Sequence, residues 1–208
     1  SMRVYVVALV LVVSFGVILY LFWSQELKYV LPTPVPANYT PKVVRQKIDL
    51  RLLPEYQKNT PAYLHFFNPY CPCSRFNLKH FNSLVNTFGA QVQVFAVIPG
   101  YADIERARDM IGNEGVIVIH DNADSFALAC GVYSTPLAVI IDSDQKLFYR
   151  GNYNKSRYCT LKESNYAEIA LNALVAGQEP PPSNQSATKS YGCELLENEN
   201  NNFITLFP

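Results

Sequence analysis

Two cysteines stand one residue apart, Cys71 and Cys73, within the segment NPYCPCSRFN at residues 68–77. A thiolate is a nucleophile and a metal ligand, and it is the reacting group in thiol–disulfide exchange. Proline is favoured at the first helical position, so Pro72 predicts that a helix begins there with Cys71 as its N-cap. The unsatisfied N–H groups and the dipole at that end of a helix stabilise a thiolate. Cys71 is therefore the predicted nucleophile.

The spacing of the pair does not suit a relaxed disulfide. At the second helical position the side chain of Cys73 points roughly 200° around the helix from that of Cys71, so a bond between them would distort the first turn. Strained disulfides are oxidising and easily reduced. Two interpretations stay open: an unstable internal disulfide, or two thiols with different partners. Packing of both side chains in the core is the structural alternative.

The other three cysteines are interpreted separately. Cys130, in ALACGV, lies on a helix face that should pack inward, and we expect it in the core. Cys159 and Cys193 are predicted to form a structural disulfide, which would close a loop of about 34 residues and contribute on the order of 3 to 4 kcal/mol in the chain-entropy model. The competing hypothesis is that one of these two cysteines resolves Cys71. Any pairing scheme leaves one cysteine over.

The apolar pattern alternates between strand-like and helix-like runs across the middle of the chain. The runs are AYLHFF, SRFNLKHFNSLVNTFG, VQVFAVIPG, ADIERARDMIGN, GVIVIHD, ADSFALACG, LAVIID, LFYRGNY and NYAEIALNALVAG. They predict the order β-α-β-α-β-α-β-β-α, an α/β fold with parallel strands, helical crossovers and an antiparallel hairpin near the end.

These residues carry a resemblance to a known fold. A strand that ends in an aromatic just before a cysteine at a helix start, followed later by Ser-Thr-Pro leading into a strand, resembles the thioredoxin fold. The likeness covers about residues 60–178 and implies a mixed central sheet flanked by helices. More narrowly, CPCSRF with the downstream STPLAVIID resembles a group of bacterial membrane-anchored thioredoxin-like proteins of poorly defined function.

The resemblance implies roles for four residues. Cys71 falls on the nucleophilic cysteine of the family, and Tyr70 falls on the aromatic residue before it. Thr135 and Pro136 fall on the turn with a cis-proline that faces the substrate. Tyr70, Thr135 and Pro136 are therefore the expected substrate-binding residues.

The resemblance also exposes a departure from the family pattern. His65 stands six residues before Cys71, where thioredoxins keep a buried aspartate that moves protons for the thiols, although a satisfied core histidine would fit the same position. The usual resolving position is occupied by Ser74, and Cys73 comes one residue early. The motif is C-x-x-S with an additional thiol inside it, which puts the ordinary dithiol cycle in doubt.

The segments outside residues 60–178 have distinct compositions. Residues 4–23 run without a charge for about 20 residues, enough to cross a roughly 30 Å hydrocarbon core as a helix, and we expect a retained anchor rather than a cleaved signal peptide. Residues 24–59 form a Pro-rich linker in which the alternation of Ile48, Leu50 and Leu52 suggests an extra strand. Residues 179–208 are expected to be a Pro/Ser-rich tail.

Three function classes fit these features. The first and favoured one is a thiol–disulfide oxidoreductase with Cys71 as nucleophile and Cys73 as second thiol. The second is a copper carrier that binds Cu(I) through the paired thiolates together with a distal histidine. Geometry disfavours His80, which lies about 10 Å along the helix axis, and leaves His120 open. The third is a membrane-tethered interaction module with idle thiols.

The expected setting follows from charge and topology. Lysine plus arginine and aspartate plus glutamate both total 17, so no excess of charge favours nucleic acid. Arg3 precedes the span, which places the domain outside the bacterial inner membrane, in the periplasm, after a single pass. Expected partners are protein thiols or disulfides, a redox partner that the sequence does not identify, and the membrane through residues 4–23. We expect no cofactor and no resident metal.

Overall fold

The strands and helices follow the predicted alternation. The computed structural model describes residues 2–24, 31–37, 39–51, 53–155, 160–182 and 184–195. The helices are α1 (Met2–Phe22), α3 (Pro72–Phe88), α4 (Ile104–Ile111), α5 (Ser125–Cys130), α6 (Tyr166–Val175) and α7 (Gln185–Thr188), with short 3-10 turns at Asn122–Asp124 and Lys162–Ser164. The strands are β1 (Ala62–Phe66), β2 (Gln93–Pro99), β3 (Ile117–Asp121), β4 (Ser134–Thr135), β5 (Leu137–Ile141), β6 (Leu147–Gly151) and β7 (Cys193–Glu194).

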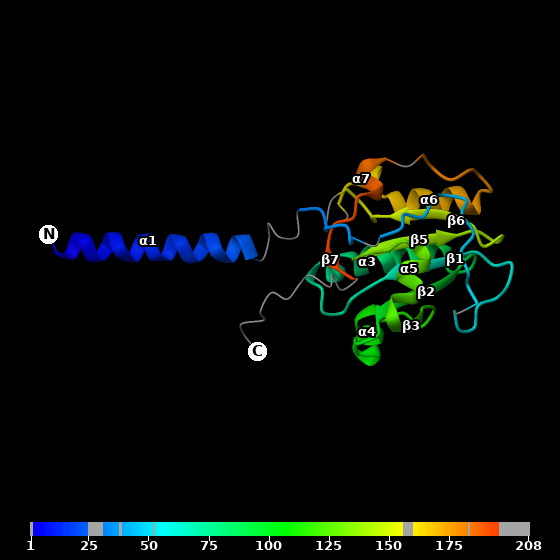
Figure 1. Cartoon of the computed structure of the whole chain (residues 1–208), viewed down its shortest axis with the longest axis horizontal. Helices are drawn as coiled ribbons and strands as arrows, with labels where there is room; N and C mark the ends of the chain where they lie inside the picture. Colours follow the sequence, from blue (N-terminus) through cyan, green and yellow to red (C-terminus); the bar gives the residue numbers. More distant parts are fainter. Residues whose placement is uncertain are drawn as a thin grey trace.

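One five-stranded mixed sheet organises the domain, in the order β3-β2-β1-β5-β6. Strand β2 is parallel to β1 and to β3, whereas β5 is antiparallel to β1 and to β6. Figure 1 shows helices on both sides of this sheet. A parallel βαβ unit joined to an antiparallel hairpin, with the first helix entered directly after the central strand, is the thioredoxin-like arrangement. The predicted fold class is confirmed.

Alternate residues of the central strand supply two separate cores, because successive side chains of a strand point to opposite faces of the sheet. Tyr63 packs in a cluster with residues of α3, α4 and α6, whereas Leu64 and Phe66 pack in a cluster with residues of α5. All five residues of β1 are buried. The end of β1 is therefore fixed from both sides, and with it the loop that leads to Cys71.

The segment expected to be a linker contributes to the second of these cores. Ile48, Leu50 and Leu53 are buried in the cluster that includes α5. The predicted extra strand is reduced to one bridge, between Lys47 and Lys146, and Leu52 lies outside the described residues. The apolar alternation therefore reflects burial against the domain, with only local pairing beside the β5–β6 hairpin.

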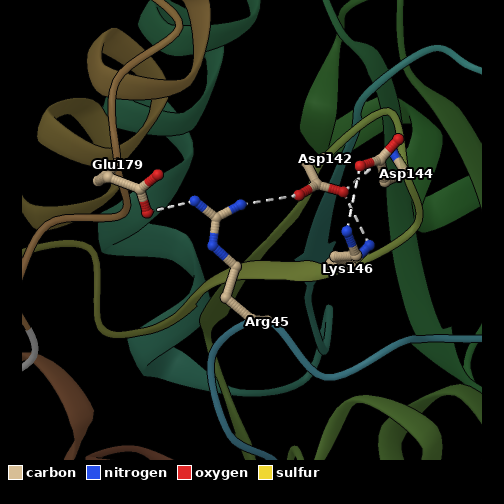
Figure 2. Close-up of polar contacts among 5 residues, drawn as sticks. All are labelled: Arg45, Asp142, Asp144, Lys146 and Glu179. Carbon is tan, nitrogen blue, oxygen red and sulfur yellow. Dashed lines mark hydrogen bonds and ion pairs between the residues drawn. The ribbon is translucent and has the colours of Figure 1, made fainter.

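An ionic network ties the same segment to two other parts of the chain (Figure 2). The guanidinium of Arg45 pairs with Glu179, which follows α6, and with Asp142 at 3.4 Å, at the end of β5. The backbone N–H of Lys146 donates to Asp142 at 2.8 Å, and its ammonium group lies 3.2 Å from Asp144. Exposed pairs contribute little each, so the network orients these segments more than it stabilises them.

Helix α1 leads away from the α/β domain in Figure 1 and buries no residue against it. It is 21 residues long with a mean hydropathy of 2.8, which is long and apolar enough to cross a membrane. A signal peptide near an N-terminus has the same length and apolar composition. The helix therefore supports membrane association, through either kind of segment.

Removing the side chain of Leu50 tests whether the linker belongs to the folded domain. Because Leu50 is 1% exposed, Leu50→Ala should lower the free energy of unfolding by about 2 to 5 kcal/mol. Val43→Ala is the control, since Val43 is 64% exposed and should change stability by less than about 0.5 kcal/mol. Urea unfolding of the full chain in detergent, followed by near-ultraviolet circular dichroism, measures both. Equal effects of the two substitutions on the free energy of unfolding would show that Leu50 is not part of the cooperatively folding domain.

Candidate active site

Cys71 is the N-cap of α3, as the position of Pro72 predicts. Its backbone is extended, with φ −83° and ψ 121°, and Pro72 begins the helix. Its N–H donates to the carbonyl of Asn68 at 3.0 Å, and its own carbonyl accepts from the N–H of Ser74 at 3.1 Å. The side-chain oxygen of Asn68 accepts from the N–H of Tyr70 at 2.9 Å. This turn, typical of asparagine, leads the chain from β1 into the first turn of α3.

The Thr135–Pro136 turn lies next to this cysteine. The peptide bond between Thr135 and Pro136 is cis, and the carbonyl oxygen of Thr135 lies 3.7 Å from the Cys71 sulfur. Both observations confirm the predicted geometry. The turn joins the short strand β4 to β5, which pairs with β1, the strand that precedes Cys71. The central sheet therefore brings two segments 64 residues apart to one point.

The partner of Cys71 differs from the prediction. Cys71 forms a disulfide with Cys193, with their Cα atoms 6.1 Å apart and a sequence separation of 122. The predicted Cys159–Cys193 disulfide is therefore wrong, and Cys159 lies outside the described residues. The reason is a strand pairing: β7 runs antiparallel to β4 and sets Cys193 opposite Thr135. The competing hypothesis, that Cys159 or Cys193 resolves Cys71, is compatible with this bond.

Cys73 lies in the same place as this disulfide. The sulfur atoms of Cys71, Cys73 and Cys193 all lie within 4.8 Å of one another. Cys73 is buried in the first turn of α3 and keeps its thiol. The site therefore holds one disulfide and one thiol, close enough for exchange after a small movement.

The tail that carries Cys193 is held at several points. Residues 190–192 contact the linker at Thr33. The Thr33 N–H donates to the Ser190 carbonyl at 3.0 Å, and the Thr33 hydroxyl donates to the Gly192 carbonyl at 3.2 Å. Beyond β7, the Leu195 N–H donates to the Tyr133 carbonyl at 3.0 Å, and the Leu195 side chain is buried. Cys193 therefore lies in a short strand that hydrogen bonds hold on both sides.

His65 occupies the middle of β1 and is completely buried. The Tyr153 hydroxyl, which accepts from Tyr63, lies 2.7 Å from Nδ1, and the ring stacks on Phe81 at a centroid distance of 4.2 Å. Burial lowers the pKa of His65 to about 3. At neutral pH the ring is therefore uncharged. Its burial and its stacking on Phe81 are the contacts of a core residue. The proton-carrying role stays a prediction.

Aromatic side chains surround the approach to Cys71. Tyr70 is half exposed, and the guanidinium of Arg106 lies 5.2 Å from the centre of its ring. Tyr101 is exposed, and its hydroxyl accepts from the side-chain amide of Asn68 at 3.0 Å. The expected substrate-binding role of Tyr70 stays a prediction. Sequence reasoning did not identify Asn68 or Tyr101.

The remaining thiol and imidazoles lie apart from the three sulfurs. Cys130 is fully buried as predicted, and burial together with the carboxylate of Asp121 raises the pKa of its thiol to about 12. The ring of His120 donates from Nε2 to the carbonyl of Ala102 at 2.8 Å. Among the described residues, the group able to hold a metal near Cys71 consists of the three thiols alone.

Fold, cis-proline and helix-capping cysteine together define a thioredoxin-like protein. The chain belongs to the family described as "Domain of unknown function (DUF6436)", which matches residues 42–194. No curated protein matches the sequence.

Solved structures resemble the chain in fold. An uncharacterized conserved protein from Geobacillus kaustophilus superposes with a TM-score of 0.59 at 21% identity, covering 69% of this chain and 80% of that one. A hypothetical protein from Sinorhizobium meliloti 1021 gives a TM-score of 0.56 at 20% identity, covering 66% and 80%. A thioredoxin-like protein determined in its oxidized form gives 0.47 at 16% identity, covering 74% and 100%.

The buried state of His65 predicts a pH dependence. The unfolded chain protonates this imidazole near its ordinary pKa of 6.5, whereas the folded chain leaves it neutral down to about pH 3. The folded pKa is depressed, so the free energy of unfolding should fall as the pH drops from 6.5 toward 3, by up to about 1.4 kcal/mol per pH unit.

His65→Gln, which carries no titrating group, should show a shallower slope between pH 6 and pH 4 in urea unfolding experiments. His80→Gln is the matched control. Burial also lowers the pKa of His80, but His80 is only about half buried, so the change in slope should be smaller. Identical slopes for the wild-type chain and His65→Gln would mean that His65 is protonated in the fold.

Proposed function

We propose that the protein is a membrane-tethered thiol–disulfide oxidoreductase with Cys71 as its nucleophile. The observation that carries the proposal is the Cys71–Cys193 disulfide at the N-terminus of α3, beside the cis-peptide turn at Thr135–Pro136. Packing in a core alone does not require a cysteine at a helix N-terminus beside this turn. The position favours the thiolate form of Cys71 when the disulfide opens.

Reduction of a substrate would take two exchange steps. The Cys71 thiolate attacks one sulfur of a protein disulfide, so that a mixed disulfide forms and the other substrate sulfur leaves as a thiolate. The Cys193 thiolate then attacks the Cys71 sulfur, which restores the Cys71–Cys193 bond and releases the second substrate thiolate. Two electrons pass from the cysteine pair to the substrate.

The same steps run in reverse oxidise a substrate dithiol, so the relative reduction potentials decide the direction. A separate dithiol or disulfide protein has to return the cysteine pair to its starting state. That protein is the redox partner the sequence left unidentified.

Two thiols compete for the role of resolving Cys71. The sequence favoured Cys73, and its sulfur lies within 4.8 Å of the other two. We assign the role to Cys193 because it holds the bond to Cys71 and because the geometry of the first helical turn disfavours a bond between Cys71 and Cys73. Cys73 is then a third thiol within reach of the pair.

The proposed location is the periplasmic side of a bacterial inner membrane. Helix α1 supplies an apolar segment of sufficient length, and Arg3 precedes its apolar run. A disulfide persists in an oxidising compartment such as the periplasm. Protein thiols or disulfides in that compartment are the proposed substrates.

A copper carrier is the second candidate, because a specific observation favours it. When reduced, the three sulfurs of Cys71, Cys73 and Cys193 would offer soft thiolate ligands within 4.8 Å of one another, and thiolates select Cu(I). The chemistry of this donor set differs from the pair of thiolates and a histidine expected from the sequence. A tethered interaction module would leave all three thiols idle.

Cysteine variants should rank the resolving thiols. Cys193→Ser should accumulate mixed disulfides through Cys71 in non-reducing gels of membrane fractions, because attack on substrate remains and release is lost. Cys73→Ser should accumulate fewer, and Cys71→Ser should accumulate none. If Cys73→Ser accumulated the most, Cys73 would be the resolving thiol.

The same variants separate the metal candidate from the enzyme. A three-thiolate site would lose Cu(I) affinity in all three variants and would give no covalent adduct in any of them. Adducts in Cys193→Ser with no change in copper retention would favour the oxidoreductase. If the thiols neither react with substrates nor bind copper, the tethered interaction module is the remaining candidate function.

Topology can be tested by fusion. A C-terminal reporter that is active only in the cytoplasm should show no activity, whereas a reporter that needs the periplasm should be active. The mature chain should keep residues 4–23, as determined by mass measurement. An active cytoplasmic reporter, or a chain that begins after residue 24, would contradict the proposed anchor and orientation.

A further inference from the structure

The described end of the tail, Tyr191-Gly192-Cys193-Glu194-Leu195, occupies the strand edge beside Cys71. We propose that this edge binds extended protein segments with glycine directly before a cysteine and an apolar residue two positions after it, and that residues 191–195 are the chain's own copy of such a segment. The proposal rests on the proposed function and specifies the substrates of the same site.

The backbone pairing shows how a cysteine reaches Cys71. Ser134 is paired with Glu194, and Thr135 with Cys193, in an antiparallel register. Thr135 is also the residue whose carbonyl lies 3.7 Å from the Cys71 sulfur. A peptide that adds a strand at β4 therefore sets the residue opposite Thr135 in reach of Cys71. The tail and a substrate need the same edge, so they compete for it.

The position before the cysteine accepts only glycine in this geometry. Gly192 has a φ of +140°, which residues with a side chain rarely adopt. A Cβ atom there would overlap the carbonyl oxygen of Thr135 and would lie 3.0 Å from its carbon. Because Thr135 is fixed by β5 and by the neighbouring cysteine, it cannot move away. A substrate with a larger residue would pair less closely with β4.

The position two residues after the cysteine is apolar. The side chain of Leu195 is 7% exposed and belongs to the buried cluster that includes α5. Glu194 between them is exposed, so that position carries no requirement for an apolar side chain. Alternate residues of a strand share a face, and Leu195 therefore enters the core on the side where Cys193 meets Cys71.

The flanking contacts with the linker involve backbone groups of the tail. The Thr33 hydroxyl donates to the carbonyl of Gly192, and the Thr33 N–H donates to the carbonyl of Ser190. Carbonyl groups are present in every sequence, so these contacts add affinity for any extended segment. Discrimination between substrates therefore rests on the glycine and on the apolar residue.

Activated peptides test this recognition directly. The full-length Cys193→Ser protein in detergent would be mixed with the pentapeptide Tyr-Gly-Cys-Glu-Leu, whose cysteine carries a coloured aromatic thiol as a disulfide. Attack by Cys71 joins the peptide to the protein and releases the coloured thiolate, so the absorbance gives the rate. The matched peptide should react at least about tenfold faster than peptides with valine in place of glycine or aspartate in place of leucine.

The controls separate this inference from the proposed function. A small aromatic disulfide without a peptide should react with Cys71 in the same protein, and Cys71→Ser should be unreactive with both probes. Equal rates for the three peptides, with a normal rate for the small disulfide, would overturn the recognition alone. A Cys71 that reacts with neither probe would overturn the oxidoreductase itself.

Tail variants test the competition. Adding Leu195→Asp to Cys193→Ser should weaken the hold of the tail and raise the rate with the matched peptide several-fold, more than the rate with the small disulfide. Adding Lys189→Gln, at an exposed position outside residues 191–195, should leave the peptide rate unchanged. Equal acceleration of both probes by Leu195→Asp, or none, would show that the tail does not compete as a substrate copy.

Discussion

The antiparallel pairing of β4 with β7 is the interaction on which the site depends. Two residue pairs, Ser134 with Glu194 and Thr135 with Cys193, bring a cysteine from the end of the described chain to the N-terminus of α3. So short a ladder is weak by itself. Burial of Leu195, the hydrogen bonds to Thr33 and the disulfide across 122 residues hold it together. In the chain-entropy model a loop of that size contributes on the order of 5 kcal/mol.

The environment gives each described cysteine a different chemistry. Cys130 is enclosed by the core at the C-terminal end of α5, where burial favours the neutral thiol and no helix N-terminus stabilises a thiolate. Cys71 ends a turn organised by Asn68 and is the N-cap residue of α3. Cys73 is two residues further, at the second position of α3, and is buried with its sulfur within 4.8 Å of the disulfide sulfurs. Reactivity therefore follows from position relative to the start of α3, and residue type alone does not decide it.

The linker joins the membrane side of the chain to the site. Thr33 follows α1 closely in sequence and contacts the tail, while Leu50 and Arg45 fix the same segment to the core and to the β5–β6 hairpin. A Pro-rich composition predicts a segment without regular secondary structure, and the described linker residues form only turns and isolated bridges. What composition could not indicate is that the extended chain lies against the domain. The linker therefore contacts both the core and the tail segment beside Cys71.

The sequence by itself determined the order of strands and helices, the apolar helix at the N-terminus, the capping position of Cys71 and the burial of Cys130. Each of these depends on residues within a few positions of one another: apolar periodicity, the preference of proline for the first helical turn, or an inward helix face. The cis peptide at Pro136 came from the resemblance to thioredoxins. Only the tertiary structure decided that Cys193 and not Cys159 or Cys73 bonds to Cys71, and that Leu50 belongs to the core. The physical reason is that pairing between distant strands uses backbone hydrogen bonds, which every residue except proline can make. The sequence of β7 therefore does not indicate which strand it pairs with.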